Sequence, residues 1–195
     1  LVPRDEKGRS NYRMGALRPN QFGGDDAHVV EYVASIAEAS GEFLQIVNFN
    51  LAGQQYAVAG TVAGLKALEE DATKRAAERG GKRPFMYVPG IDVPFHSTVL
   101  RSGVADFRTK IDERIPAEID PAKLVGRYIP NLVARPFELT REFAQSILDV
   151  VPSETVRELL EVPGAWDAAL ANPGALTRTL LIELLCWQFA SPVRW

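Results

Sequence analysis

The sequence is poor in the residues that disulfide frameworks and metal centres require. Its 195 residues include one cysteine and two histidines. A single thiol can form neither an internal disulfide nor an iron–sulfur site, and it fits a reducing cytosol. No cysteine or histidine spacing typical of metal ligands occurs. We therefore expect a cytoplasmic protein that holds no metal.

Long apolar runs and clustered positive charge are also missing. No stretch approaches the roughly 20 apolar residues of a membrane span, and no signal peptide opens the chain. The net charge is −3 and the 22 lysines and arginines are scattered, whereas a nucleic-acid-binding protein shows a basic face. We expect no membrane or nucleic-acid partner. Because the chain lacks an initiator methionine and stops just after an apolar segment, we expect a piece of a longer polypeptide.

Common catalytic and nucleotide-binding motifs are absent as well. There is no G-x-x-x-x-G-K-[ST] or G-x-G-x-x-G loop for phosphate, and no G-x-S-x-G nucleophile elbow. The acidic run at 69–71 has the pattern of a solvated helix face. The absence of these motifs leaves only a few residues as candidates for a catalytic or binding role.

The first half alternates strand and helix patterns. Apolar, β-branched runs predict strands at 12–18, 43–49, 55–60 and 83–88. Apolar residues at helical spacing predict one helix after Asp25 and Asp26, ending at Gly41, and another that Thr61 caps. The order β-α-β-β-α-β, with crossovers flanking a hairpin, predicts a ferredoxin-like sandwich.

The second half is mostly helical. Helix patterns follow Ser97 and recur at 140–150, 153–160 and 174–190, and one strand pattern lies at 128–134. A lone strand is unstable, so we expect its partners elsewhere in a longer polypeptide. The last helix is apolar around much of its circumference. We expect one of its faces to be under-covered; this face comprises Leu180, Leu181, Leu184 and Leu185.

The two histidines differ in their expected surroundings. His28 lies on the polar side of the first helix and is expected to be solvated. His96 lies in a loop between a strand and a helix, just before the expected N-cap Ser97. The positive end of a helix dipole disfavours imidazolium, which suits a general base. The other interpretation, which position alone favours, is a loop histidine that caps backbone groups.

Two asparagines and the cysteine are the remaining candidates. Asn48 and Asn50 are two residues apart on an apolar strand, which predicts that they share a face. We favour the interpretation that they brace the following turn over a binding role. Cys186, on the apolar last helix, is interpreted as a core residue.

Five groups of short segments add a resemblance to this picture. They are VPRDE (2–6) with GRSNY (8–12); VNFN (47–50) with QQY (54–56) and AG (59–60); VPFHS (93–97); YIPNL (128–132); and QFASPVRW (188–195). Together, and in this order, they resemble the acyltransferases of fatty acid and polyketide synthases. The likeness is greatest to the malonyl/palmitoyl transferase of fungal-style and mycobacterial-style type I fatty acid synthases.

The resemblance implies an α/β architecture of two subdomains. In the family, a ferredoxin-like small subdomain is inserted into an α/β-hydrolase-like large subdomain. Residues 1–11 then form a lead-in segment and 12–90 the small subdomain. Residues 91–195 comprise the catalytic-histidine loop and the C-terminal part of the large subdomain, which is incomplete.

The resemblance also implies a Ser-His acyl-enzyme mechanism. A serine upstream of Leu1 attacks an acyl-coenzyme A thioester, His96 is the base, and the phosphopantetheine thiol of acyl carrier protein resolves the intermediate. Gln188 matches the position whose main-chain carbonyl orients the histidine. Phe95 matches a position that sets acyl selectivity, and Asn48 and Asn50 are further candidates for substrate binding.

The implied partners are the acyl carrier protein domain and the rest of a synthase polypeptide, a homo-oligomer in the parent. The fragment itself is expected to bind no cofactor. Since the serine and the arginine that pairs the malonyl carboxylate lie before Leu1 in the family, we expect the fragment alone to be inactive. The alternatives are a non-catalytic ferredoxin-like ligand-binding module and a carrier-protein docking module.

Overall fold

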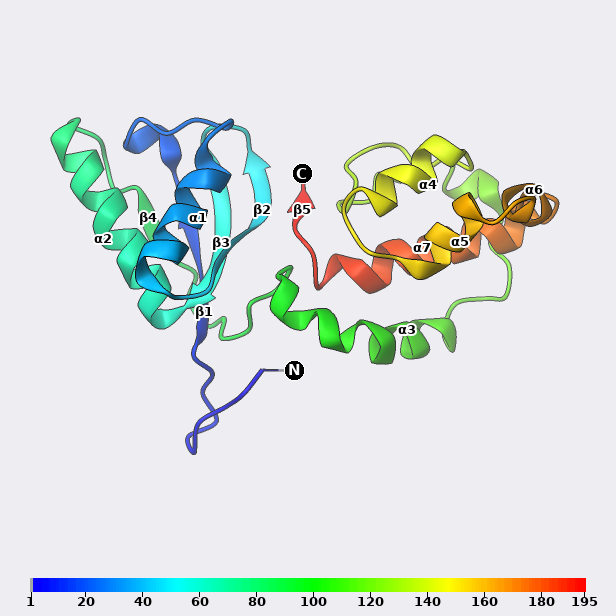
Figure 1. The fold of residues 1–195 in the computed structure, drawn as a ribbon, viewed down its shortest axis with the longest axis horizontal. Helices are drawn as coiled ribbons and strands as arrows, with labels where there is room; N and C mark the ends of the chain where they lie inside the picture. The colour runs from blue at the N-terminus through cyan, green and yellow to red at the C-terminus, as the bar shows by residue number, and fades with distance from the viewer. Residues whose placement is uncertain (1) are drawn as a thin grey trace. The chain divides into compact units, whose positions relative to one another are not determined.

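The computed structural model describes residues 2–195, which form two compact units. One unit extends to Leu100 and also takes Trp195; the other comprises Arg101–Arg194. The described residues contain five strands and seven α-helices, so the chain is a mixed α/β protein (Figure 1).

The first unit has the predicted order of strands and helices. Its elements are β1 (Tyr12–Leu17), α1 (Val29–Ser40), β2 (Leu44–Leu51), β3 (Gln55–Thr61), α2 (Val62–Glu78) and β4 (Phe85–Tyr87). A short 3-10 turn, η1 (Pro19–Gln21), follows β1. The strands lie in the order β4-β1-β3-β2, and each neighbouring pair is antiparallel. Strand β1 therefore lies between β4 and β3, and β3 lies between β1 and β2.

The main core of this unit lies between the sheet and its two helices, which pack side by side on it (Figure 1). The apolar stripe of α2 is buried there; it comprises Leu65, Leu68, Ala72 and Ala76. Burying each leucine contributes roughly 1.5–3 kcal/mol. Thr61 caps α2, because its Oγ1 accepts from the N–H of Gly64 at 3.1 Å. Gly41 ends α1 with φ 67°, the left-handed conformation that glycine adopts most readily.

Two details of the first unit differ from the sequence prediction. Regular helix α1 begins at Val29, later than expected, because a turn comes first. Asp25 caps that turn by accepting from the N–H of His28 at 2.9 Å, whereas Asp26 accepts from the hydroxyl of Tyr56. The register of β2 against β3 also shifts between Ile46 and Asn48 and between Phe49 and Leu51. The regular alternation assumed for this strand therefore does not hold along its whole length.

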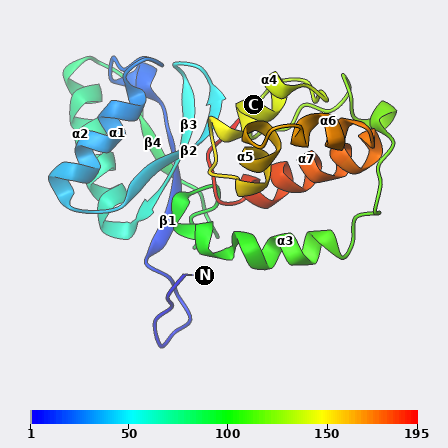
Figure 2. The same ribbon diagram turned by 45° about the vertical axis from the view of Figure 1, so that its right-hand side comes forward.

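The second unit is helical. Its elements are α3 (Val104–Asp112), α4 (Arg141–Leu148), α5 (Glu154–Glu161), α6 (Ala165–Leu170), α7 (Pro173–Gln188), the 3-10 turn η3 (Pro121–Lys123) and the two-residue strand β5 (Val193–Arg194). Helices α3 and α7 pack along one another (Figure 2). Side-chain oxygens cap three of the helices, with Thr140 on α4, Ser153 on α5 and Asn172 on α7.

The strand predicted at 128–134 does not form, and that prediction was wrong. The segment is a series of turns, in which the N–H of Tyr128 donates to Leu124 and the N–H of Ala134 donates to Pro130. Pro130 lacks an N–H for a strand ladder, and Ala134 has φ 51°, which ends extended structure. Because no strand forms here, the expectation that it pairs with strands elsewhere in a longer polypeptide no longer applies.

The last helix is also better covered than expected. Leu180 and Leu184 are fully buried in the core of the second unit, and Leu181 and Leu185 are half-buried. The apolar side chains of α4, α5 and α6 supply this core, together with Leu132 and Phe137 of the turn segment. A helix that is apolar on several sides thus finds partners within the chain.

Candidate functional site

His96 lies in the loop that leaves the first unit's sheet after β4. The loop leads into a 3-10 turn, η2 (Thr98–Gly103), and α3 begins only at Val104. A regular helix therefore does not begin at Ser97 as expected. His96 is half-buried, and its backbone φ is 60°. For a residue with a Cβ, this left-handed conformation costs on the order of 1–3 kcal/mol and persists only where neighbouring contacts hold it.

Two neighbouring side chains fix the turn on its C-terminal side. Ser97 is fully buried, and its hydroxyl donates to the carbonyl oxygen of Pro94 at 2.6 Å. The N–H and hydroxyl of Thr98 both donate to Oε1 of Gln45 on β2, at 3.0 and 3.1 Å. The residue after the turn is thereby tied to the sheet, so that the histidine has little freedom to leave its position.

On the N-terminal side of His96, the loop is held by an ion pair between two residues that are far apart in sequence. The guanidinium of Arg4 donates to both carboxylate oxygens of Asp92, at 2.6 and 3.2 Å. The hydroxyl of Ser10 donates to the main-chain oxygen of the same Asp92. The hydrogen bond from Arg4 lowers the pKa of the Asp92 carboxyl, which is therefore ionised at neutral pH.

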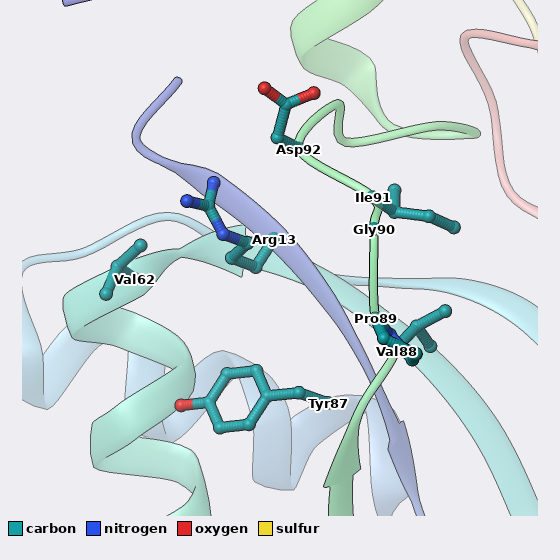
Figure 3. Close-up of a pocket in the computed structure, with 8 residues that line it drawn as sticks. All are labelled: Arg13, Val62, Tyr87, Val88, Pro89, Gly90, Ile91 and Asp92. Carbon is teal, nitrogen blue, oxygen red and sulfur yellow. The ribbon is translucent and has the colours of Figure 1, made fainter. Parts of the chain in front are cut away.

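An open pocket of about 480 Å³ borders the same loop. Arg13 of β1, Tyr87 of β4 and Asp92 contribute its polar groups, and Val62 at the start of α2 lines it as well (Figure 3). Arg13 is partly engaged, since it donates to the carbonyl oxygens of Ser10 and Tyr12.

The sheet also carries Asn48 and Asn50, which were predicted to share a face. The register shifts on β2 remove the basis of that prediction, and no side-chain hydrogen bond of either residue to the turn is found in the described chain. Tyr56 holds the turn instead, since its hydroxyl accepts from the N–H of Gly53 at 2.7 Å. Within residues 2–195, Oδ1 of Asn48 is a buried acceptor without a hydrogen-bond partner.

Phe95, His28 and Gln188 lie at three different places in the fold. Phe95, directly before the histidine, is 44% exposed. His28 is exposed as predicted, and its Nδ1 lies 2.8 Å from Asp25. Gln188 is the last residue of α7 in the second unit. The carbonyl groups in the last turn of a helix accept hydrogen bonds from groups beyond that helix.

The second unit contains a buried charge cluster that the sequence did not reveal. Glu183 of α7 is fully buried and pairs through both carboxylate oxygens with the guanidinium of Arg108 on α3. Ser153 and Trp187 also donate to it, at 2.7 and 3.3 Å. Burial alone raises the pKa of Glu183, but the hydrogen bonds from Arg108 and Ser153 outweigh it and the net pKa is lowered. The carboxylate thus stays ionised inside the core.

Neither a metal site nor a membrane span emerges from the part of the chain that the structure describes. Within residues 2–195, no group of three or more His, Cys, Asp or Glu residues is arranged to hold a metal ion. Over the same residues, no helix has the length and apolar character needed to cross a bilayer.

The sequence is similar to fungal fatty acid synthases. It is 39% identical over 230 residues to fatty acid synthase 2 of Mycosarcoma maydis, a match that covers 100% of this chain and 6% of that protein. It is 33% identical over 202 residues to fatty acid synthase subunit beta of Saccharomyces cerevisiae, covering 82% of this chain and 10% of the subunit. The chain thus spans about a tenth or less of the curated relatives that it matches. No known family profile matches it.

The fold is similar to that of bacterial malonyl transacylases. FabD from Acinetobacter baumannii superimposes with a TM-score of 0.58 at 19% identity, over 96% of this chain and 42% of that one. A malonyl-transacylase solved in complex with a type II polyketide synthase acyl-carrier protein gives 0.54 at 15% identity, with the same coverages of 96% and 42%. The chain therefore belongs to the fungal-type fatty acid synthases, as a partial domain whose fold is similar to that of malonyl transacylases.

Proposed function

We propose that this chain is part of a malonyl/palmitoyl transferase, which moves malonyl and long-chain acyl groups between coenzyme A and acyl carrier protein. One observation carries the proposal: the same residues match fungal fatty acid synthases in sequence and malonyl transacylases in fold. The first similarity indicates the multienzyme, and the second indicates the class of reaction.

We assign residues 12–90 to a ferredoxin-like small subdomain, with 1–11 as its lead-in. The antiparallel order β4-β1-β3-β2, with two helices on one face, supports this assignment. Residues 91–195 are then an incomplete part of an α/β-hydrolase-like large subdomain. In this arrangement the small subdomain's sheet is the scaffold from which the His96 loop extends.

In the proposed reaction His96 transfers protons. A serine from a part of the synthase outside this chain attacks the thioester carbon of an acyl-coenzyme A. His96 takes the proton of the serine and gives it to the departing coenzyme A sulfur. In the second half, His96 takes a proton from the phosphopantetheine thiol, whose sulfur attacks the acyl ester, and returns that proton to the serine. A half-buried imidazole on a rigidly held turn supports this role.

Four other residues receive supporting roles in this proposal. The main-chain carbonyl of Gln188 orients His96, as the end of a helix suits an acceptor. The exposed ring of Phe95 contributes to acyl selectivity. Asn48 and Asn50 bind substrate; the buried and unpaired Oδ1 of Asn48 supports its part, because such an acceptor is normally satisfied by a donor.

The proposed partners follow from the same reaction. The carrier-protein partner is supported by the related fold that was solved with its acyl-carrier protein. Coenzyme A thioesters and the phosphopantetheine arm are the substrates of the intact domain, while this chain holds no cofactor of its own. The rest of the synthase, a cytoplasmic homo-oligomer in this proposal, supplies the nucleophile.

Replacing His96 by Ala in the intact synthase tests the proposal. We expect transfer of malonyl from malonyl-coenzyme A to holo acyl carrier protein to fall by about 100-fold or more, because a general base contributes roughly 10²–10⁴ in rate. His28→Ala is the matched control, since His28 is the chain's other histidine and is exposed on the same unit. Equal transfer by the two variants would contradict the proposal and favour a ligand-binding or docking module.

A further inference from the structure

The segment 4–10 takes no part in the proposed chemistry, yet it contacts the loop that carries the proposed base. Arg4 and Ser10 are its two contact residues, and both meet Asp92, four positions before His96. We propose that Arg4 and Asp92 form a positioning clamp, assisted by Ser10, that holds the His96 loop in its working geometry. This inference rests on the proposed function, because it assigns a purpose to the placement of His96.

The clamp is preformed, because the segment folds on itself. A bridge joins Arg4 to Ser10, and Gly8 turns the chain with φ 72°. Within the turn, Asp5 accepts from the N–H groups of Lys7 and Arg9, at 2.9 and 2.8 Å. The guanidinium of Arg4 and the hydroxyl of Ser10 are thus presented together at the base of the turn. Asp92 thus accepts hydrogen bonds through both its side chain and its main chain.

The clamp adds to a limited amount of apolar packing, in which Val88 and Ile91 of the loop lie against the buried Met14, Val47 and Ala59. Pro89 and Gly90 are exposed, and Ile91 and Asp92 are half-buried. Figure 3 shows the loop running along the open pocket, with the carboxylate of Asp92 at its far end. Between β4 and the buried Pro94, the side-chain hydrogen bonds that hold the loop in the described chain are those of Asp92 with Arg4 and Ser10.

The position of His96 is set between two anchors. Asp92 is held from segment 4–10, and Thr98 is held by Gln45 of the sheet. Between them the left-handed His96 is adjacent to Ser97, whose hydroxyl closes the turn on Pro94. Releasing Asp92 removes the anchor on the N-terminal side of the strained turn. The imidazole then samples positions away from the reacting groups, so the rate suffers while the binding of coenzyme A does not.

The clamp predicts a distinctive kinetic pattern in the intact synthase. Arg4→Gln and Asp92→Asn are each expected to lower kcat for malonyl transfer by about tenfold with little change in KM, since small misplacement of a catalytic group is costly. The double variant is expected to match either single variant, because both remove one interaction. Arg4→Lys keeps the charge and is expected to recover most of the rate.

Arg75→Gln is the matched control. It breaks the Arg75–Asp71 pair on α2, which joins an arginine and an aspartate of similar exposure in the same unit. Hydrogen exchange of residues 91–98 gives a second readout: we expect faster exchange there in Arg4→Gln and Asp92→Asn, and unchanged exchange in Arg75→Gln.

The outcomes separate this inference from the proposed function. If His96→Ala abolishes transfer while Arg4→Gln and Asp92→Asn behave like Arg75→Gln, the clamp is wrong and the base assignment stands. If KM rises with kcat unchanged, or the double variant is multiplicatively worse, the positioning role is overturned. If His96→Ala transfers normally, the proposed function itself fails.

Discussion

His96 keeps a left-handed backbone although it carries a Cβ, and its neighbours explain how. Pro94 and Ser97 are buried on either side of the turn, and a hydroxyl-to-carbonyl hydrogen bond of 2.6 Å joins them. The only other non-glycine residue with positive φ in the described chain is Ala134, which ends a series of turns. The strain at His96 is therefore local to the loop that we assign to catalysis, which is where backbone strain commonly occurs.

Cys186 provides a residue-scale prediction because it is the chain's only cysteine and is fully buried. Burial raises the pKa of its thiol to about 11. At pH 8, three units lower, only about one thiol in a thousand is the reactive thiolate. We expect a disulfide reagent to label the native protein very slowly and the urea-unfolded protein rapidly. Fast labelling of the native protein, with none in Cys186→Ser, would contradict the buried placement.

At the scale of elements, one buried carboxylate links three helices of the second unit. Glu183 of α7 accepts from Arg108 of α3 and from Ser153, which also caps α5 by accepting from the N–H of Val156 at 3.1 Å. Removing the buried carboxylate leaves the half-buried guanidinium of Arg108 without its partner. The helix packing of this unit therefore depends on a polar contact as well as on its apolar core.

Replacing Glu183 by Gln tests this dependence. We expect the second unit to lose about 3 kcal/mol of stability at pH 7, in the range found when one partner of a buried pair is removed. The folded-state pKa of Glu183 lies below its unfolded value, so its contribution is present above the unfolded value and is lost as pH falls through the folded one. The difference between wild type and Glu183→Gln should shrink as pH falls below about 4.

Urea-dependent labelling of Cys186 measures this effect, because the thiol lies in the same unit. The matched control is Glu158→Gln, which removes an exposed carboxylate from α5. A variant at Glu183 as stable as the one at Glu158, or a difference that grows in acid, would show that the buried pair does not stabilise the helices.

The elements that sequence patterns predicted well are those whose burial is regular. Three sequence signals predict helix α2: an apolar stripe at helical spacing, Thr61 as its cap, and a glycine pair beyond its end. All three indicate the same helix, and the structure has it. The false strand at 128–134 has the same apolar composition as a real one, but Leu132 is buried against helices. Helix α6 was missed because it is six residues long and begins after Gly164 at φ 77°.

The histidine loop could be found from sequence, but its support could not. Two histidines left few candidates, and one of them lay on a polar helix face. Arg4 and Asp92 are 88 residues apart, and no periodicity joins them. Arg4 and His96 do lie in two of the segments that carried the family resemblance. In the sequence, this was the one indication that the two regions act together.

At the scale of the whole molecule, the proposed catalytic parts come from distant stretches of chain. The first unit has its own core and carries His96, and the second has a separate core and carries Gln188. The nucleophilic serine in our proposal lies outside residues 1–195. Each unit thus holds one proposed catalytic group on its own core, and neither holds the proposed nucleophile.

This division predicts that the 195-residue chain alone does not transfer malonyl groups. Ser97 is the serine next to His96, but it is fully buried and its hydroxyl is bonded to Pro94, so it cannot attack a thioester. Ser10 is buried as well and donates to Asp92. We expect no malonyl-serine adduct by mass spectrometry after incubation with malonyl-coenzyme A, whereas the intact synthase forms one under the same conditions. An adduct on the isolated chain that disappears in His96→Ala would show that this chain contains its own nucleophile, and the assignment of the serine to another part of the synthase would be wrong.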